Sequence, residues 1–230
     1  HLDKKTLVSL RWIAIIGQLI AINFVYHYLK LDFLIIGAHS IILIGLITNL
    51  ILQFKIKENQ FKDLYSSFFL IYDLFQLTLL LYLTGGISNP FSFLMIVPSI
   101  VSSTFLSMGT TIILGTLTIT SLFFLKNYHK ILPGLDAYRF SFPEYYLEGI
   151  LISIIIGLIF LSYFGIRFSG ETKKRSEALE KLQQVMAREY QLDSLGGLAA
   201  AAAHSLGTPL ATISVVAKEL KKEIGDKSKH

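Results

Sequence analysis

Long apolar runs separated by short polar links make up the first three quarters of the chain. Six of these runs are long enough, or nearly so, to cross a hydrocarbon core of about 30 Å as α-helices. They cover residues 7–29, 33–54, 64–84, 91–107, 110–125 and 145–168. The pattern predicts an all-α membrane protein with six transmembrane helices.

The fourth and fifth runs are the shortest of the six, and only the tight link at 107–110 separates them. The favoured interpretation is that each run crosses the membrane. The alternative is that the two runs form one re-entrant pair. Proline lacks an amide hydrogen and its ring clashes with the preceding turn, so Pro98 is predicted to kink the fourth helix.

The pattern changes after residue 168. Seam residues then recur at alternating spacings of four and three, and only Glu189 and Gly196 interrupt the apolar series. This is the period of helices that bury a seam against a partner helix, so the segment is predicted to form part of a bundle or coiled coil, between two chains of a homodimer. The seam consists of Ala178, Leu182, Val185, Glu189, Leu192, Gly196, Ala199, Ala203, Leu206, Leu210, Ile213, Ala217, Leu220 and Ile224.

Composition and charge agree with a membrane protein. Hydrophobic residues make up 53% of the chain, and the net charge is +5. One set of links carries Lys4, Lys5, Lys55, Lys57, Lys62, Arg167, Lys173, Lys174 and Arg175, and the other carries Lys30, Lys126, Lys130 and Arg139. The positive-inside rule therefore places both termini in the cytoplasm. Basic residues beside anionic lipid account for the charge, so no nucleic-acid partner is expected.

His204 directly follows the seam residue Ala203, so it is predicted to face outward. Pro209 lies about one turn later and should bend the helix there. An outward imidazole beside a weakened turn suits a histidine that is itself modified, and a solvated surface histidine is the alternative.

The run GGLAAAAAHSLGTPLATI at 196–213 resembles the phosphoacceptor box of sensor histidine kinases, specifically that of the RegB/PrrB redox-sensor family. The resemblance implies that His204 accepts the phosphoryl group, for transfer to a response regulator. It also implies that Thr208 occupies the position associated with phosphatase action. Ser205 departs from the acidic residue usual after the histidine, and a serine hydroxyl is a poor proton acceptor near neutral pH.

A second specific stretch is GGISNPF at 85–91. Its glycines release the chain from the third helix, and its amides and aromatic rings could bind a quinone by hydrogen bonds and stacking. A helix-breaking turn with an interfacial aromatic residue is the alternative. The stretch resembles the GGxxNPF motif of the RegB/PrrB family, which is implicated in sensing ubiquinone or another membrane quinone. The resemblance assigns ligand binding to Gly85, Gly86, Asn89, Pro90 and Phe91.

Asp73 lies in the middle of an apolar run, where an acidic side chain is costly without a partner. Arg11, Asn23 and Asn49 are candidate partners, protonation is another solution, and a structural contact is favoured over a proton relay. A helix rises 1.5 Å per residue, so Asp73 lies about 18 Å from Gly85 and is not assigned to the binding site. Among the six histidines, no two show the spacing of a helical metal pair, and no metal site is expected.

The apolar runs and the resemblance to the RegB/PrrB family together predict that the chain has three parts. These are a six-helix sensor domain at 1–168, a juxtamembrane coiled-coil linker at 169–191 and a truncated first phosphotransfer helix at 192–230. No Asn-box or Gly-rich ATP lid follows, so this chain alone should neither bind ATP nor phosphorylate itself. The family implies a bacterial inner-membrane location. The alternatives are a six-helix transporter or channel with Asp73 as its coupling site, and a membrane scaffold.

Overall fold

The structure is a computed structural model that describes residues 2–31, 33–55, 63–130 and 142–227. Within these ranges every regular element is a helix, which confirms the predicted all-α membrane fold. Lys57, Lys62 and Arg139, which entered the charge argument, lie outside the described residues. The elements are α1 (Lys4–His27), α2 (Ile35–Lys55), α3 (Asp63–Leu83), η1 (Gly86–Ser88), η2 (Pro90–Ile96), α4 (Val97–Phe105), α5 (Met108–Asn127) and α6 (Glu144–Lys227).

Among the described residues, five helices have the length and apolar composition of membrane spans, namely α1, α2, α3, α5 and α6. The fourth predicted run is shorter, at Pro90–Phe105, and is not one α-helix. It begins with seven residues of 3₁₀-helix and continues with nine of α-helix. Because a 3₁₀-helix rises about 2.0 Å per residue against 1.5 Å in an α-helix, the segment reaches about 27 Å.

Pro98 does not lie inside one continuous fourth helix, as the kink prediction assumed. It lies in the first turn of α4, which begins at Val97. The first amides of a helix have no partner inside the helix, so a proline there removes no hydrogen bond and its fixed φ suits the start. The kink prediction failed because the sequence did not reveal that the α-helix starts only one residue before the proline.

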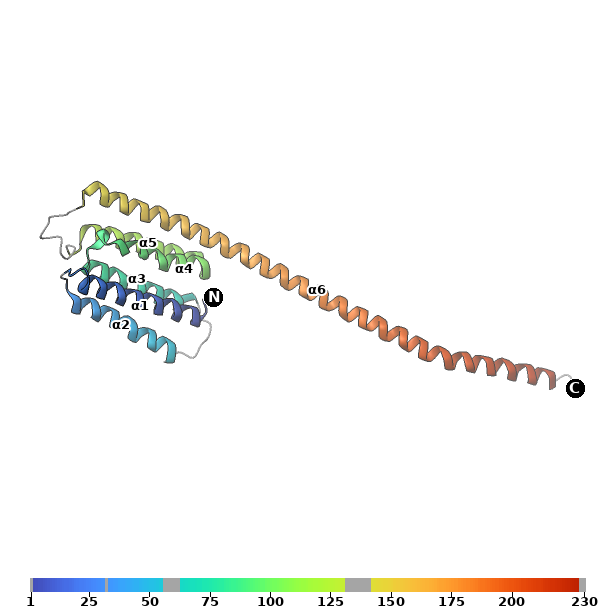
Figure 1. Ribbon diagram of the computed structural model, residues 1–230. Helices are drawn as coiled ribbons and strands as arrows, with labels where there is room; N and C mark the ends of the chain where they lie inside the picture. The colour runs from blue at the N-terminus through green and yellow to red at the C-terminus, as the bar shows by residue number, and fades with distance from the viewer. Residues whose placement is uncertain (1, 32, 56–62, 131–141, 228–230) are drawn as a thin grey trace. The chain divides into compact units, whose positions relative to one another are not determined.

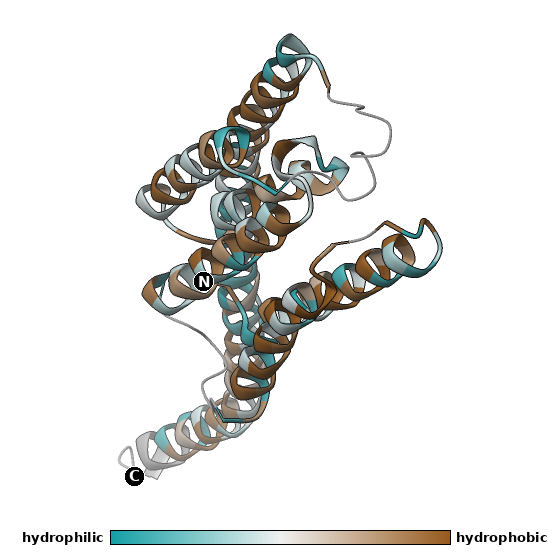
Figure 2. Ribbon diagram, turned by 90° about the vertical axis from the view of Figure 1, so that its left-hand side faces the viewer, coloured by the Kyte–Doolittle hydropathy of each residue, from teal (hydrophilic) through white to brown (hydrophobic). Residues whose placement is uncertain are grey.

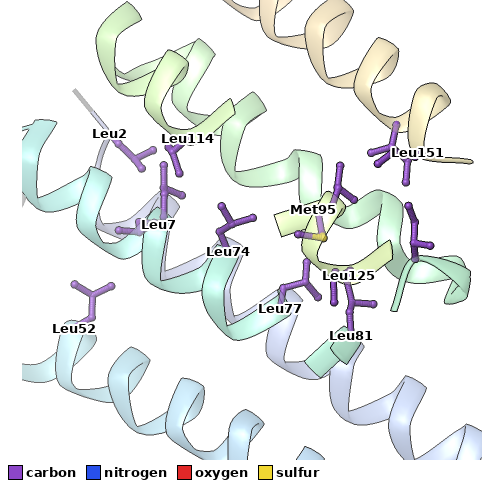
Figure 3. Packing of buried hydrophobic residues seen from close by; sticks show 14 of the residues in the cluster. Leu2, Leu7, Leu52, Leu74, Leu77, Leu81, Met95, Leu114, Leu125 and Leu151 are labelled. Carbon is purple, nitrogen blue, oxygen red and sulfur yellow. The ribbon is translucent and has the colours of Figure 1, made fainter. Parts of the chain in front are cut away.

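Helices α1 to α5 pack as a bundle (Figure 1). α1 packs against α2, α2 against α3, and α3 against both α4 and α5. The core lies where α3, η2 and α5 meet, and Figure 3 shows Leu74, Met95 and Leu125 converging there. Met95 and Leu125 are fully buried, so one face of η2 packs into the core of the bundle.

Apolar residues, brown in Figure 2, make up most of the membrane helices, and many of them are exposed on the outside of the bundle. Ile36 and Leu64 are each 78% exposed, and Phe160 is 65% exposed. Lipid tails are as apolar as these side chains, so such exposure is stable only within a bilayer. The chain is therefore a multi-pass membrane protein.

Hydroxyl groups join α4 to α5 inside the bundle. Ser99 and Thr118 lie 3.2 Å apart at their oxygens, and Ser102 and Thr111 lie 3.0 Å apart. Small hydroxylated residues let two membrane helices approach closely and hydrogen-bond across the interface. The short α4 is thus attached to α5 by polar contacts as well as by apolar packing.

The chain forms two compact units, and the long helix α6 runs through both. The first unit ends at Glu171, and the second begins at Thr172. In the first unit, α6 buries Leu151, Ile154 and Leu158. In the second unit every described side chain is exposed, and the seam residue Leu206 is 61% exposed. Burial of the seam against a partner helix, like the predicted three-part division, stays a prediction.

Gly165 marks a close approach between α6 and α4. A Cβ at this position would overlap the Ser103 hydroxyl, which is itself held by the Ile100 carbonyl. We expect Gly165→Leu to force the two helices apart and to lower the free energy of unfolding by about 1 to 3 kcal/mol. Thermal unfolding of the purified chain in detergent would measure this change.

Gly157→Leu is the matched control, since a Cβ at Gly157 of the same helix would meet nothing within 4 Å. A Gly165→Leu protein that unfolds at the same temperature as the Gly157→Leu protein would contradict the close approach of α6 to α4 at Gly165.

Candidate functional site

The GGISNPF stretch forms the reversal between α3 and η2. Gly85 and Gly86 have φ values of 106° and 60°, a left-handed conformation that glycine adopts without strain. η1 follows directly, and Asn89 then caps η2 with Pro90 in its first turn. The predicted release of the chain by the two glycines is therefore found at the positions expected.

Gly86 also meets the end of α5 too closely for any side chain. A Cβ there would lie 2.5 Å from the His129 ring and 2.7 Å from the Leu125 carbonyl oxygen. The same carbonyl contacts His129 Nδ1 at 2.8 Å, which fixes the ring over the turn. His129 thus helps to hold the turn, a role that nothing in its sequence context indicated.

The amide of Asn89 is fully used within the turn. Its nitrogen donates to the Thr84 carbonyl and to the Thr84 hydroxyl, at 2.9 Å each, and its oxygen accepts from the Phe91 backbone N–H at 2.9 Å. These bonds tie the end of α3 to the start of η2. Asn89 therefore shapes the turn first, and a ligand would have to compete with the turn for its amide.

A cavity of about 590 Å³ lies between α1 on one side and α3, η2 and α4 on the other. This volume is in the range of ligand sites in proteins. Asn89, Pro90 and Phe91 line the cavity near the turn, whereas Gly85 and Gly86 are buried behind it and do not. The structure thus brings three of the five predicted binding residues to one cavity.

The same cavity extends along α1 and α3 to Arg11 and Asp73. Asp73 was not assigned to the site because its distance from Gly85 along the helix is too long for contact with a ligand at the turn. The cavity, however, covers the interval between the turn and Asp73. The site therefore has two polar ends, joined by an apolar wall that includes Leu77, Leu81 and Leu94.

Arg11 is the partner of Asp73, which selects one of the three sequence candidates. Arg11 Nε donates to Asp73 Oδ1 at 2.9 Å, and Nη2 donates to the Thr48 hydroxyl at 2.9 Å. The two other candidates bond elsewhere, Asn23 to the Leu19 carbonyl and Asn49 to the Val8 carbonyl. The pair links α1 to α3, and Thr48 adds α2.

The predicted phosphotransfer residues lie in the second unit. α6 continues through Pro209 without interruption, and His204, Thr208 and Thr212 border a shallow groove along one of its faces. Figure 1 shows the red end of α6 turning from the line of its orange part, as the predicted bend requires. Ser205 donates its hydroxyl to the Ala202 carbonyl at 3.2 Å. His204 is exposed, so a large donor can reach its imidazole.

The apolar outer surface, the internal cavity and the long last helix define a multi-pass helical membrane protein. Residues 10–179 match the model of the PilS-like transmembrane domain, and the chain belongs to this family. The chain is 38% identical over 229 residues to the sensor histidine kinase RegB of Cereibacter sphaeroides, and to a second RegB from a named strain of that species. The predicted resemblance to the RegB/PrrB family is confirmed.

Each match covers 96% of this chain and 48% of the relative, so the chain spans about half the length of the curated relatives that it matches. No solved structure matches the chain.

Proposed function

We propose that this chain is the sensor part of a two-component histidine kinase, and that it detects the redox state of membrane quinone. The observation that carries the proposal is the cavity beneath the GGISNPF turn, which opens between membrane helices. A quinone is a flat, apolar ring with two carbonyl acceptors. The cavity offers apolar walls along most of its length and polar side chains at both ends, which is the pattern of small-molecule sites.

The turn residues would act on the ligand in different ways. Phe91 is 42% exposed and lines the cavity, so its ring is available for stacking. Pro90 supplies a rigid wall, and Asn89 holds both residues in place through its three hydrogen bonds. Gly85 and Gly86 contribute by the conformation that they permit rather than by contact.

Signal output would use the second unit. His204 is the proposed phosphoacceptor, and a domain outside this chain would supply ATP and Mg²⁺. Thr208 would assist removal of the phosphoryl group from the response regulator. α6 supports this proposal because one uninterrupted helix carries Leu151, which is buried in the bundle, and His204. The exposed apolar seam would pack against a second copy of the chain, as coiled-coil seams do.

Location and topology follow from the same proposal. The membrane would be the bacterial inner membrane, with both termini in the cytoplasm, where a response regulator can reach His204. The transporter alternative gave Asp73 the role of coupling site, and the pairing of Asp73 with Arg11 accounts for that residue without transport.

Binding of a soluble ubiquinone analogue to the chain in nanodiscs tests the proposal. The native protein should bind saturably. Asn89→Ala should weaken binding about five-fold or more, because the variant loses hydrogen bonds that shape the end of the cavity. Fluorescence or calorimetric titration would measure the dissociation constants.

Asn127→Ala is the matched control. Its amide bonds only the Phe123 carbonyl at 2.9 Å on the exposed side of α5, and it does not line the cavity. Absence of binding to the native chain would reject quinone sensing. Equal loss of affinity in both variants would reject the role of the turn.

A further inference from the structure

One pair of amide side chains interrupts the apolar wall between the two ends of the cavity. Gln18 of α1 and Gln76 of α3 both line the cavity, and Gln76 Nε2 donates to Gln18 Oε1 at 3.3 Å. A side-chain amide has two N–H donors and one acceptor oxygen. The bond between the two residues uses the oxygen of Gln18, so its nitrogen is left for another partner.

The nitrogen of Gln18 is accessible from the cavity. Gln18 Nε2 has no hydrogen bond among the described residues, and it is not buried. Its neighbours Ala14, Gly17 and Ala21 are small and line the same cavity. A Cβ at Gly17 would meet nothing within 4 Å, so the space beside the amide is open. A ligand in the cavity can therefore reach this donor.

The other side-chain donors of the cavity are engaged or covered. Thr84 donates to a carbonyl of its own helix at 2.9 Å, and the Asn89 nitrogen is used by the turn. Arg11 is bonded to Asp73, and its Nη1 is buried. Among the described residues that line the cavity, Gln18 is thus the one whose side-chain donor atom is both unbonded and accessible.

The contacts of Gln76 explain why Gln18 presents its nitrogen to a ligand. A Cβ at Gly45 of α2 would overlap the Gln76 amide, so the missing side chain lets this amide lie against α2. From that position Gln76 donates to the oxygen of Gln18. The N–H groups are then the part of the Gln18 amide that a ligand can bond, and they require an acceptor.

We propose that Gln18 Nε2 donates a hydrogen bond to a carbonyl oxygen of the quinone ring. This inference rests on the proposed quinone site and identifies the residue that recognises the ligand oxygen. Gln76 lies eight residues before Thr84, which anchors the turn, so about 12 Å of α3 separates the amide pair from the turn. A ring that also contacts Phe91 lies in this interval.

Two probes separate recognition of the oxygen from apolar binding. One is decylubiquinone, and the other is decylbenzene, which has the ring and tail without the oxygens. The dissociation constant of each probe is measured for the whole chain in nanodiscs of one lipid composition. Each variant is compared with the native chain for the same probe, so differences in partitioning of the probes into lipid cancel.

Two variants remove the amide and leave side chains of different shape. Gln18→Met keeps the length of the side chain, and Gln18→Leu shortens it. Both should bind decylubiquinone about five-fold more weakly than the native chain does, the factor that one neutral hydrogen bond contributes. Both should bind decylbenzene with the native affinity, since apolar contacts remain.

Gln53→Met is the matched control. Gln53 also bonds between two membrane helices, because it accepts a hydrogen bond from Trp12 of α1 at 3.1 Å, but it does not line the cavity. This variant should bind both probes as the native chain does.

The outcomes distinguish this inference from the proposed function. Unchanged affinity for decylubiquinone in either Gln18 variant would overturn the inference and leave the quinone site standing. Loss of both probes in both variants would also overturn it, because Gln18 would then shape the cavity rather than recognise an oxygen. Failure of the native chain to bind decylubiquinone would overturn both proposals.

Discussion

Replacing Asp73 with alanine should lower the free energy of unfolding of the purified chain by about 3 to 5 kcal/mol. The change leaves Arg11 buried at 3% exposure with no carboxylate, and an unpaired buried charge is strongly destabilising. Unfolding in mixed micelles, followed by loss of helical circular dichroism, would measure the difference. The cost is large because Arg11 links α1 to both α2 and α3.

The control is the double variant Arg11→Met with Asp73→Leu. It removes both charges together, so it should recover most of the lost stability. Together with the single variants Arg11→Met and Asp73→Leu, this double variant forms a cycle that isolates the coupling between the two residues. A double variant that is less stable than Asp73→Ala would show that the pair is not the source of the effect.

Replacing Ser205 with glutamate should accelerate phosphorylation of His204 by about 100-fold, in a full-length kinase that contains this chain. The reason is general-base assistance, for which a positioned carboxylate contributes about two orders of magnitude or more. The Ser205 hydroxyl is a poor proton acceptor and already donates to the Ala202 carbonyl. The rate of incorporation of labelled phosphate from ATP would measure the change.

Ser194→Glu is the matched control, since it adds the same charge at an exposed position of the same helix, ten residues before His204. It should leave the rate unchanged, and His204→Gln should abolish labelling. A Ser205→Glu rate equal to the native rate would mean that the base lies outside the residue that follows the histidine.

The sequence predicted elements well where one physical signal dominates. Apolar runs long enough to cross a bilayer located α1, α2, α3 and α5, because burial in lipid leaves a helix as the one stable backbone for such a segment. The Gly85–Gly86 pair located the reversal after α3 because left-handed φ values favour glycine. The α4 region was harder to predict, because an apolar run does not distinguish 3₁₀ from α geometry.

The candidate site was predicted in part for the same reason. Pro90 and Phe91 were assigned from a local motif and do line the cavity. Arg11 was only one of three candidate partners of Asp73, since residues 62 positions apart in sequence meet only after the bundle forms. The free Nε2 of Gln18 and the contact of His129 with Gly86 depend on side-chain geometry, which no spacing rule encodes.

The mixed helix at Pro90–Phe105 makes the protein sensitive to the thickness of its bilayer. The 24 residues of α1 reach about 36 Å, whereas η2 and α4 together reach only about 27 Å. In a thicker membrane, such as one rich in sterols, we expect hydrophobic mismatch to arise first at this short segment. The bilayer then thins around the segment, or the neighbouring helices tilt. Because the Ser103 hydroxyl of this segment lies close to Gly165 of α6, we expect a change in bilayer thickness to shift the membrane part of α6, the helix that also carries His204.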